Sequence, residues 1–156
     1  MSIDKVRTYF KGHNIEERII EFDVSSATVE LAARALSCEE ARIAKSMSFM
    51  TSDGPIIIVC AGDTKVNNKK FKQTFNAKAS MISPDRLGEL VGHEMGGVCP
   101  FAIREGVRVF LDESLKRFDT VFPACGSSNS AIELTIPELE KYSNFTSWVD
   151  VTITKE

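Results

Sequence analysis

The spacing of apolar residues predicts several short helices. Within residues 29–36 the apolar positions recur every three or four residues, which is the spacing of one helix face. Ser26 or Thr28, both residue types that cap helix N-termini, is expected to begin this helix. Thr135 and Glu138 have the spacing of a capping box and predict another start. Further helices are expected over residues 4–11 and 67–75 and after the capping residues Ser37 and Ser83.

Alternating and continuous apolar runs predict strands between these helices. Polar and glycine-rich turns at residues 52–55 and 126–129 each separate two such runs, which predicts two hairpins. Val149, Val151 and Ile153 alternate with polar residues, so one strand would place all three on the same face. The expected strands cover residues 19–24, 44–50, 56–61, 79–82, 107–111, 120–124, 131–135 and 148–153.

These elements together favour one mixed domain. About seven strands interspersed with short helices indicate an α/β or α+β fold, in which a barrel-like, mainly antiparallel sheet is flanked by the helices. A chain of 156 residues is long enough for one well-cored domain and short for two, so we expect a single domain over residues 1–156. The 43% hydrophobic and 26% charged residues are ordinary for a globular protein.

The sequence lacks the signals of a secreted or membrane protein, and its cysteines are typical of a reducing compartment. Residues 1–5 lack the apolar core of a signal peptide, and the longest aliphatic run, residues 56–59, is too short to span a bilayer. No two cysteines have a CxxC spacing, which argues against a metal site and against a disulfide framework. We therefore expect a cytoplasmic protein without a cofactor. Its cysteines are Cys38, Cys60, Cys99 and Cys125.

The overall charge argues against binding nucleic acid through bulk electrostatics. The net charge is −3 and the isoelectric point is about 5.5. Residues 63–78 are a local exception, with five lysines against one acidic residue. This segment is either a solvated helix face or a small contact for a phosphate backbone. The candidate contacts are Lys65, Lys69, Lys70 and Lys72.

Candidate chemistry concentrates in a glycine-rich loop and one lysine. Residues 92–100 contain three glycines and a proline, and such a loop can direct free N–H groups at a carbonyl or a phosphate. Lys45 lies in a predicted strand on the same face as Met47 and Phe49, an unusual place for a lysine. The alternative is that Lys45 extends past an apolar face to solvent and the loop is only a tight connection.

These residues in this order resemble the YbaK/ProX family of aminoacyl-tRNA editing domains. The resemblance consists of a lysine that opens a hairpin strand, then Ala61-Gly62-Asp63, then the glycine–proline loop, then a Gly-Ser-rich hairpin and residues 132–135. It extends from about residue 28 to residue 153. It implies a stand-alone deacylase built on a mixed α/β domain with a barrel-like sheet. The implied substrate is mischarged tRNA, typically tRNA for proline that carries alanine or cysteine.

The resemblance also implies which residues act. An aminoacyl ester is already activated, so its hydrolysis needs little beyond polarisation of the carbonyl and placement of an attacking oxygen. Backbone N–H groups of the loop would hold the carbonyl oxygen, and the lysine would add a positive charge. The catalytic candidates are Lys45, Gly96 and Gly97. The substrate-binding candidates are Ser46, His93, Val98, Cys99, Pro100, Gly126 and Ser127.

Water, a terminal ribose hydroxyl or the thiol of the substrate would attack, so no protein nucleophile is required. The expected partners are the acceptor end of aminoacyl-tRNA and a tRNA synthetase that supplies affinity, with no DNA and no membrane, and the chain would be a monomer or a homodimer. His93 would orient a substrate group or a water, or is only a polar surface residue.

Two other functions stay open. Cys99 or Cys125, each next to glycine or near His93 in sequence, could be a thiol nucleophile of a different hydrolase. Most intracellular cysteines are instead small buried apolar residues. The domain could also bind an amino acid, a nucleotide or a synthetase without catalysis.

Overall fold

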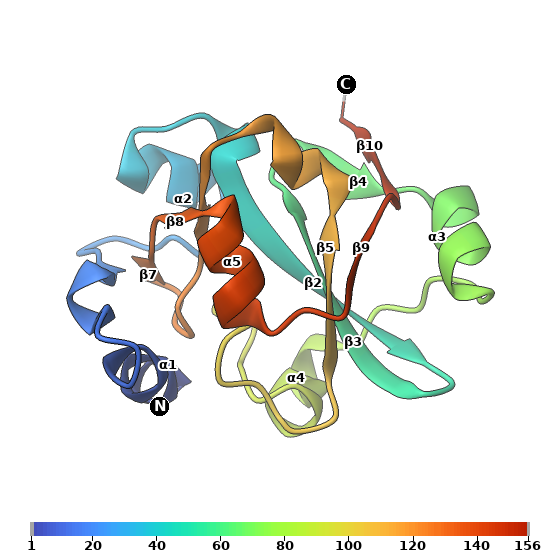
Figure 1. The fold of residues 1–156 in the computed structure, drawn as a ribbon, viewed down its shortest axis with the longest axis horizontal. Coiled ribbons are helices and arrows are strands. Elements are labelled where there is room, and N and C mark those ends of the chain that lie inside the picture. The colour runs from blue at the N-terminus through green and yellow to red at the C-terminus, as the bar shows by residue number, and fades with distance from the viewer. Residues whose placement is uncertain (1, 156) are drawn as a thin grey trace.

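A six-stranded sheet dominates the computed structural model, which describes residues 2–155. The strand order is β8–β6–β2–β3–β5–β9, and the strands twist strongly, so that the sheet curls toward a half-barrel (Figure 1). The bounds are Leu134–Thr135 (β8), Thr120–Pro123 (β6), Ile43–Thr51 (β2), Gly54–Ala61 (β3), Arg108–Asp112 (β5) and Ser147–Val149 (β9). The predicted mixed α/β fold with a curled sheet is confirmed.

Strand directions in this sheet are mixed. The β2–β3 hairpin and the β6–β8 pair are antiparallel, as the two turn sequences predict. The pairs β2–β6, β3–β5 and β5–β9 are parallel. Parallel neighbours need long crossover connections, which a local turn sequence does not predict. The main sheet therefore contains more parallel pairing than the expected mainly antiparallel sheet.

Two small antiparallel pairs lie beside the main sheet. They are β1 (Ile20–Glu21) with β7 (Ser130–Ala131), and β4 (Thr64–Val66) with β10 (Thr152–Thr154). The stretch predicted as a strand over residues 79–82 forms only an isolated bridge between Met81 and Phe49. The strand predicted over 19–24 is reduced to the two residues of β1.

The single strand predicted over residues 148–153 is wrong: the structure has two strands there, β9 and β10, and the side chain of Asp112 binds the chain between them. The carboxylate of Asp112 is fully buried and accepts hydrogen bonds from the Val151 N–H at 2.9 Å and the Thr152 hydroxyl at 2.7 Å. The pairing of β9 with β5 therefore ends at Val149, and the chain continues as β10, which pairs with β4. Ile153 is 39% exposed and does not share the buried environment of Val149 and Val151.

Most of the predicted helix starts are confirmed at their capping residues. Thr28 accepts a hydrogen bond from the Leu31 N–H, and Thr135 and Glu138 form the complete capping box. Ser37 is the exception: it ends α2 in a left-handed conformation with φ 55°, and no side-chain cap begins the short 3₁₀ turn that follows. The α-helices within the described residues are Ser2–Lys11 (α1), Val29–Leu36 (α2), Asn68–Phe75 (α3), Leu87–Leu90 (α4) and Ile136–Ser143 (α5).

Short 3₁₀ helices connect several of these elements: Glu40–Arg42 leads directly into β2 and Pro84–Arg86 into α4. A proline at the first position begins the one that leads into α4, as the sequence predicts for a helix start after Ser83. The 3₁₀ helices are Glu16–Arg18, Glu40–Arg42, Pro84–Arg86 and Glu113–Arg117.

The core lies on both faces of β3, which is why this strand reads as a continuous apolar run. Ile57 and Val59 pack into the largest cluster together with residues of α1 and α5. Ile56 and Ile58 pack on the opposite face with Phe71 of α3. Alternate side chains of a strand point to opposite faces, so a strand covered on both sides needs apolar residues throughout. Helix α2 packs separately, against the start of β2 and against β6.

Candidate active site

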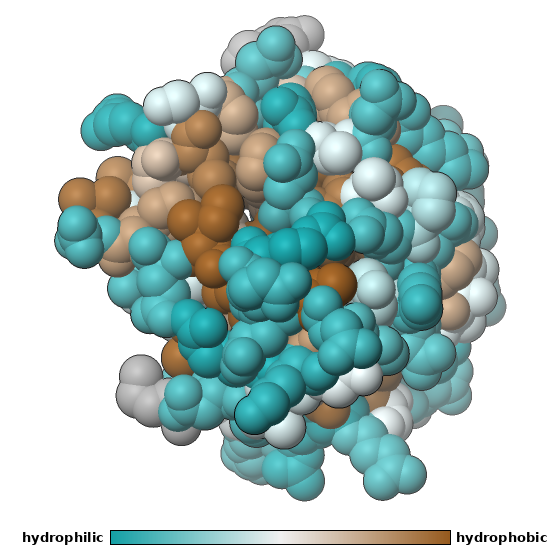
Figure 2. Space-filling view, turned by 60° about the vertical axis from the view of Figure 1, so that its left-hand side comes forward, coloured by the Kyte–Doolittle hydropathy of each residue, from teal (hydrophilic) through white to brown (hydrophobic). Residues whose placement is uncertain are grey.

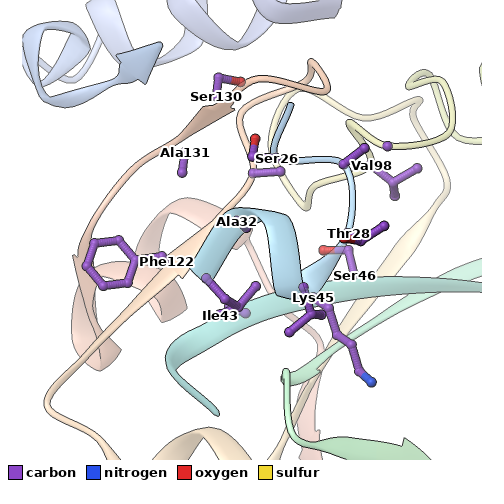
Figure 3. A pocket seen from close by; sticks show the side chains of 15 residues that line it. Ser26, Thr28, Ala32, Ile43, Lys45, Ser46, Val98, Phe122, Ser130 and Ala131 are labelled. Carbon is purple, nitrogen blue, oxygen red and sulfur yellow. The ribbon is translucent and has the colours of Figure 1, made fainter. Parts of the chain in front are cut away.

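A cavity of about 140 Å³ lies where α2, β2, the glycine loop, β6 and β7 meet. Figure 3 shows its walls, with Thr28 and Ala32 of the α2 segment on one side and Ser130 and Ala131 on another. Most lining side chains are apolar and small, and the polar ones are chiefly hydroxyls. The lining residues that the argument uses are Ser26, Thr28, Lys45, Ser46, Gly96, Val98 and Ser130.

An interruption of the sheet creates this space. Strand β6 pairs with β2 only as far as Ala44, which faces Pro123, and proline has no N–H to continue a ladder. Further along the same edge, the Ser48 carbonyl accepts from the Ile82 N–H at 3.0 Å. Ser46 lies between these two contacts, on a stretch of strand edge that no neighbouring strand covers. The cavity occupies this gap.

The glycine loop is closed by a buried histidine at its base. His93 is 0% exposed, and its Nε2–H donates to the Phe101 carbonyl at 2.6 Å, which joins the two ends of the loop. Burial is the main cause that lowers the pKa of His93, and nearby Lys5 lowers it further, whereas the bond to Phe101 raises it. The neutral ring with its proton on Nε2 fits this hydrogen bond.

Close backbone contacts require glycine at the tip of the loop. Gly96 has φ +90°, and an added Cβ would stand 3.2 Å from the Ala27 Cβ. A Cβ on Gly97 would stand 2.7 Å from backbone atoms of Gly126 and Ser127. The loop therefore rests backbone to backbone on the turn before β7, which brings the two glycine-containing segments of the sequence together.

The two glycines proposed to hold a carbonyl oxygen differ in the structure. The Gly97 N–H donates to the Glu94 carbonyl at 3.0 Å within the loop, so this group is already engaged. Gly96 and Val98 line the cavity, and their N–H groups donate to no other residue of the described chain. Among the described residues, the N–H groups of Gly96 and Val98 are therefore left without a protein partner at the cavity, whereas that of Gly97 is engaged.

Lys45 lies at the cavity with its backbone and stem, whereas its amino group lies outside. The Nζ donates to the carbonyl of Thr64 in β4, and Figure 3 shows it pointing away from the labelled residues of α2. Burial lowers the pKa of Lys45; Cys60 acts against this shift, Lys155 adds to it, and Asp63 opposes it. A lysine with a depressed pKa and a flexible stem can exchange a carbonyl partner for another acceptor nearby.

Comparison with known proteins assigns the chain to a family. The model of the aminoacyl-tRNA editing domain matches residues 24–142, which include the cavity, Lys45 and the glycine loop. The chain belongs to the aminoacyl-tRNA editing domain family. The resemblance expected from the sequence is thereby confirmed.

Relatives of this editing domain occur alone and within larger proteins. It is 55% identical over 152 residues to the uncharacterized protein YwhH of Bacillus subtilis strain 168, with 97% of each chain covered. It is 26% identical to a proline–tRNA ligase of Listeria monocytogenes, covering 90% of this chain and 25% of the ligase. The chain thus spans about a quarter of that ligase.

Solved structures agree in fold. One described as "a putative trans-editing enzyme for prolyl tRNA synthetase" superposes with a TM-score of 0.87 at 23% identity over 97% of each chain. Another, of hypothetical protein APE2540, gives a TM-score of 0.84 at 24% identity, with 96% of this chain covered and 99% of that one. These TM-scores establish that the editing domain shares its fold with both proteins.

The cysteine candidates of the editing domain lie in its interior. Cys99 is 0% exposed, with its Sγ 3.4 Å from His93 Nε2, and burial raises the pKa of its thiol to about 12. Cys125 is equally buried, and burial raises its pKa well above the usual value. His93 Nε2, the ring nitrogen nearest Cys99, carries the proton that it donates to the Phe101 carbonyl, so it has no free lone pair to accept the thiol proton. Neither thiol, nor the His93 side chain, reaches the cavity.

Four further candidates line neighbouring grooves. Gly97, Gly126 and Ser127 line an open groove of about 650 Å³ on the other side of the glycine loop, together with Lys5. Pro100 lines a third hollow. Of the predicted catalytic and substrate-binding residues, Lys45, Ser46, Gly96 and Val98 line the small cavity, and the others do not.

The lysine candidates lie away from the cavity. Figure 1 shows α3 at the right-hand edge of the molecule and α2 at the left. Lys65, Lys69 and Lys72 are exposed. Lys70 is not free, because its Nζ donates to Asp150 at 3.0 Å and to the Thr152 carbonyl at 2.8 Å.

The side of the editing domain that carries α2 and β7 exposes apolar surface. Figure 2 turns this side forward and shows apolar residues grouped between hydrophilic ones. Val24 and Met95, which stand close in sequence to cavity residues, are 61% and 68% exposed. Large exposed apolar side chains beside a cavity favour contact with a ligand or a partner.

Sequence reasoning missed the α2 side of the cavity. Ser26 and Thr28 line that side and were expected only as helix caps, and Ser130 of β7, on another side of the cavity, carries no local signal. No group of three or more histidine, cysteine or acidic side chains in residues 2–155 could hold a metal ion. No helix among the same residues is long and apolar enough to cross a membrane.

Proposed function

We propose that this editing domain hydrolyses the ester of mischarged aminoacyl-tRNA with a small amino acid, alanyl- or cysteinyl-tRNA for proline being the substrates that the family resemblance implies. The observation that carries the proposal is the small cavity beside unpaired N–H groups of Gly96 and Val98. A cavity of about 150 Å³ can hold a molecule as small as benzene. A volume of about 140 Å³ thus suits a small aminoacyl group and disfavours a large one.

The chemistry follows from these groups. The N–H of Gly96, with that of Val98, would hold the carbonyl oxygen as negative charge develops on it. Lys45 would leave the Thr64 carbonyl and place its charge near the same oxygen. Water attacks the carbonyl carbon, the ester bond to the ribose breaks, and the ribose oxygen takes up a proton from the attacking water, which leaves the free amino acid and the uncharged tRNA. The buried thiols with raised pKa values support a mechanism without a protein nucleophile.

Measuring deacylation of a panel of mischarged tRNAs tests this function. Lys45→Ala should remain folded and lose deacylation by about 100-fold or more, the size of one electrostatic contribution to the transition state. Lys45→Arg should recover little, because a planar fork does not replace a compact ammonium. Lys11→Ala, an exposed lysine at the end of α1, is the matched control. Near wild-type turnover by Lys45→Ala would exclude this role for Lys45.

One observation favours a second candidate function. The amino group of Lys45 is bound outside the cavity, as expected of a domain that binds an amino acid, a nucleotide or a synthetase without catalysis. The same panel separates the two functions, because a pure binding module leaves every aminoacyl-tRNA intact.

The tRNA and a synthetase are the partners that we propose. With a net charge of −3, the domain would hold tRNA weakly by itself, and a synthetase bound to the same tRNA would supply the remaining affinity. Lys65, Lys69 and Lys72 are the exposed cations of the predicted patch.

A further inference from the structure

The hydroxyl groups of the cavity are not equivalent. Four hydroxyl-bearing residues line it, and three of them already hydrogen-bond within the protein. These three are Ser26, bonded to the Ser128 carbonyl at 3.4 Å, Thr28, which accepts from the Leu31 N–H at 3.2 Å, and Ser130, paired with the Ser127 hydroxyl at 2.7 Å. The fourth is Ser46, whose Oγ is buried and has no partner among the described residues.

The unpartnered Ser46 hydroxyl favours a ligand that can form a hydrogen bond with it. Burying a hydroxyl without a hydrogen bond is unfavourable, and its partner in a complex must come from the ligand. Figure 3 shows Ser46 on the α2 side of β2, with the Lys45 amino group directed elsewhere. A ligand that reaches into the cavity lies against Ser46, whose buried hydroxyl can turn toward it, whereas the Lys45 ammonium lies at the Thr64 carbonyl in this structure.

The charge of the lining indicates which part of an aminoacyl group meets Ser46. No acidic side chain lines the cavity within the described chain, so an α-ammonium placed inside it would lack a counter-charge. The ammonium is more stable at the solvated mouth, which leaves the side chain of the amino acid to enter. A small side chain with its own hydroxyl fits both the volume and the free hydrogen-bonding group.

We propose that Ser46 is a specificity-determining residue that hydrogen-bonds the side-chain hydroxyl of a bound seryl group. This proposal rests on the proposed function and ranks the small amino acids within it. Alanyl and cysteinyl groups fit the same volume, but a methyl group offers no hydrogen bond and a thiol only a weak one. The editing domain should therefore act on seryl esters in preference to alanyl esters.

The same strand supplies a matched control. Ser48 lies two residues further along β2 and thus points to the same face as Ser46. Its Oγ is also buried and unpartnered among the described residues, and the residue is 5% exposed, but it does not line the cavity. Ser46→Ala and Ser48→Ala therefore remove the same atom from the same strand, and only the first removes it from the cavity.

The first experiment compares kcat/KM for tRNA charged with serine and with alanine. The wild-type protein should favour the seryl ester by about 10-fold, the size of one hydrogen bond. Ser46→Ala should bring the seryl-to-alanyl ratio close to one, whereas Ser48→Ala should keep the wild-type ratio. An unchanged ratio in Ser46→Ala, or an equal change in both variants, would overturn the proposal.

A binding measurement separates this proposal from the function on which it rests. The probes are 3′-serylamino- and 3′-alanylamino-3′-deoxyadenosine, whose amide bonds resist hydrolysis, and titration calorimetry measures their affinities. Absence of deacylation for every aminoacyl group would refute the hydrolytic function alone. Tighter binding of the seryl probe that Ser46→Ala abolishes would still support the role of Ser46. Equal affinities of the two probes, or no binding of either, would refute it.

Discussion

Replacing Gly97 by alanine tests whether the glycine loop depends on its backbone contact with the turn before β7. The added Cβ would lie 2.7 Å from the Gly126 carbonyl carbon and from the Ser127 nitrogen, and 2.9 Å from the Gly126 oxygen. All three are backbone atoms, so no side chain can rotate to make room. The φ of Gly97 lies outside the left-handed range, so the cost is steric alone.

The magnitude follows from this geometry. Overpacking that displaces backbone costs about 1–3 kcal/mol. For a chain of this size each kcal/mol lowers Tm by about 2–4 °C, so we expect a fall of roughly 2–12 °C. The loop must also move away from the turn, which displaces its neighbour Gly96 at the cavity wall. Deacylation should therefore decrease together with Tm.

Gly106→Ala is the control that separates steric displacement from backbone strain. Gly106 has φ +92° and no atom within 4 Å of an added Cβ. Its substitution should cost about 1–2 kcal/mol through the left-handed conformation alone and should not alter the cavity. Thermal unfolding and deacylation are measured for both variants. If Gly97→Ala melts within 1 °C of the wild type and retains its turnover, the close contact described above does not restrain the loop.

Three further predictions concern groups whose environment the structure defines. Burial lowers the pKa of His93 in the folded protein, so the unfolded chain takes up a proton at this residue first as the pH falls. The free energy of unfolding should therefore decrease below about pH 6.5. In His93→Gln the free energy of unfolding should change less between about pH 5 and 7. Iodoacetamide at pH 7 should alkylate native protein at Cys38, the one half-buried thiol of the described chain, and mass spectrometry should find Cys99 and Cys125 unmodified; rapid labelling of either would contradict their burial. Reversing Lys69 and Lys72 to glutamate should raise KM for aminoacyl-tRNA, leave hydrolysis of a small aminoacyl ester unchanged, and reduce the log–log salt slope by about 1.4, or 0.7 per contact; an unchanged salt slope would assign these lysines to a solvated face.

Local signals predicted much of the secondary structure. The β2–β3 hairpin follows from its turn sequence, and the caps at Thr28 and Thr135 come from side chains that bond N–H groups three residues away. The same kind of signal failed at Ser37, where the box spacing coincides with the end of a helix. A local pattern cannot tell these cases apart when a neighbouring helix already uses the residue.

The parallel pairs of the main sheet escaped prediction because their partners are distant in sequence. Strand β3 pairs with β5, and β2 pairs with β6. The segments that connect these strands are long and contain no turn motif that predicts the pairing. Asp112 is a similar case. Its buried carboxylate accepts hydrogen bonds from the Val151 N–H and the Thr152 hydroxyl, which lie about forty residues away, whereas its local bond to the Ser114 N–H predicts only a helix cap.

The sequence by itself determined the family, the elements and the chemical groups of the site, because the order of Lys45, the glycine loop and the serine-rich turn is a property of the chain. Only the tertiary structure decided which of these groups share a cavity. It placed Ser46 there with a free hydroxyl, directed the Lys45 amino group to Thr64, and enclosed His93 in the core. The physical reason is that burial and hydrogen-bond partners depend on packing between distant segments, which spacing along one chain does not contain.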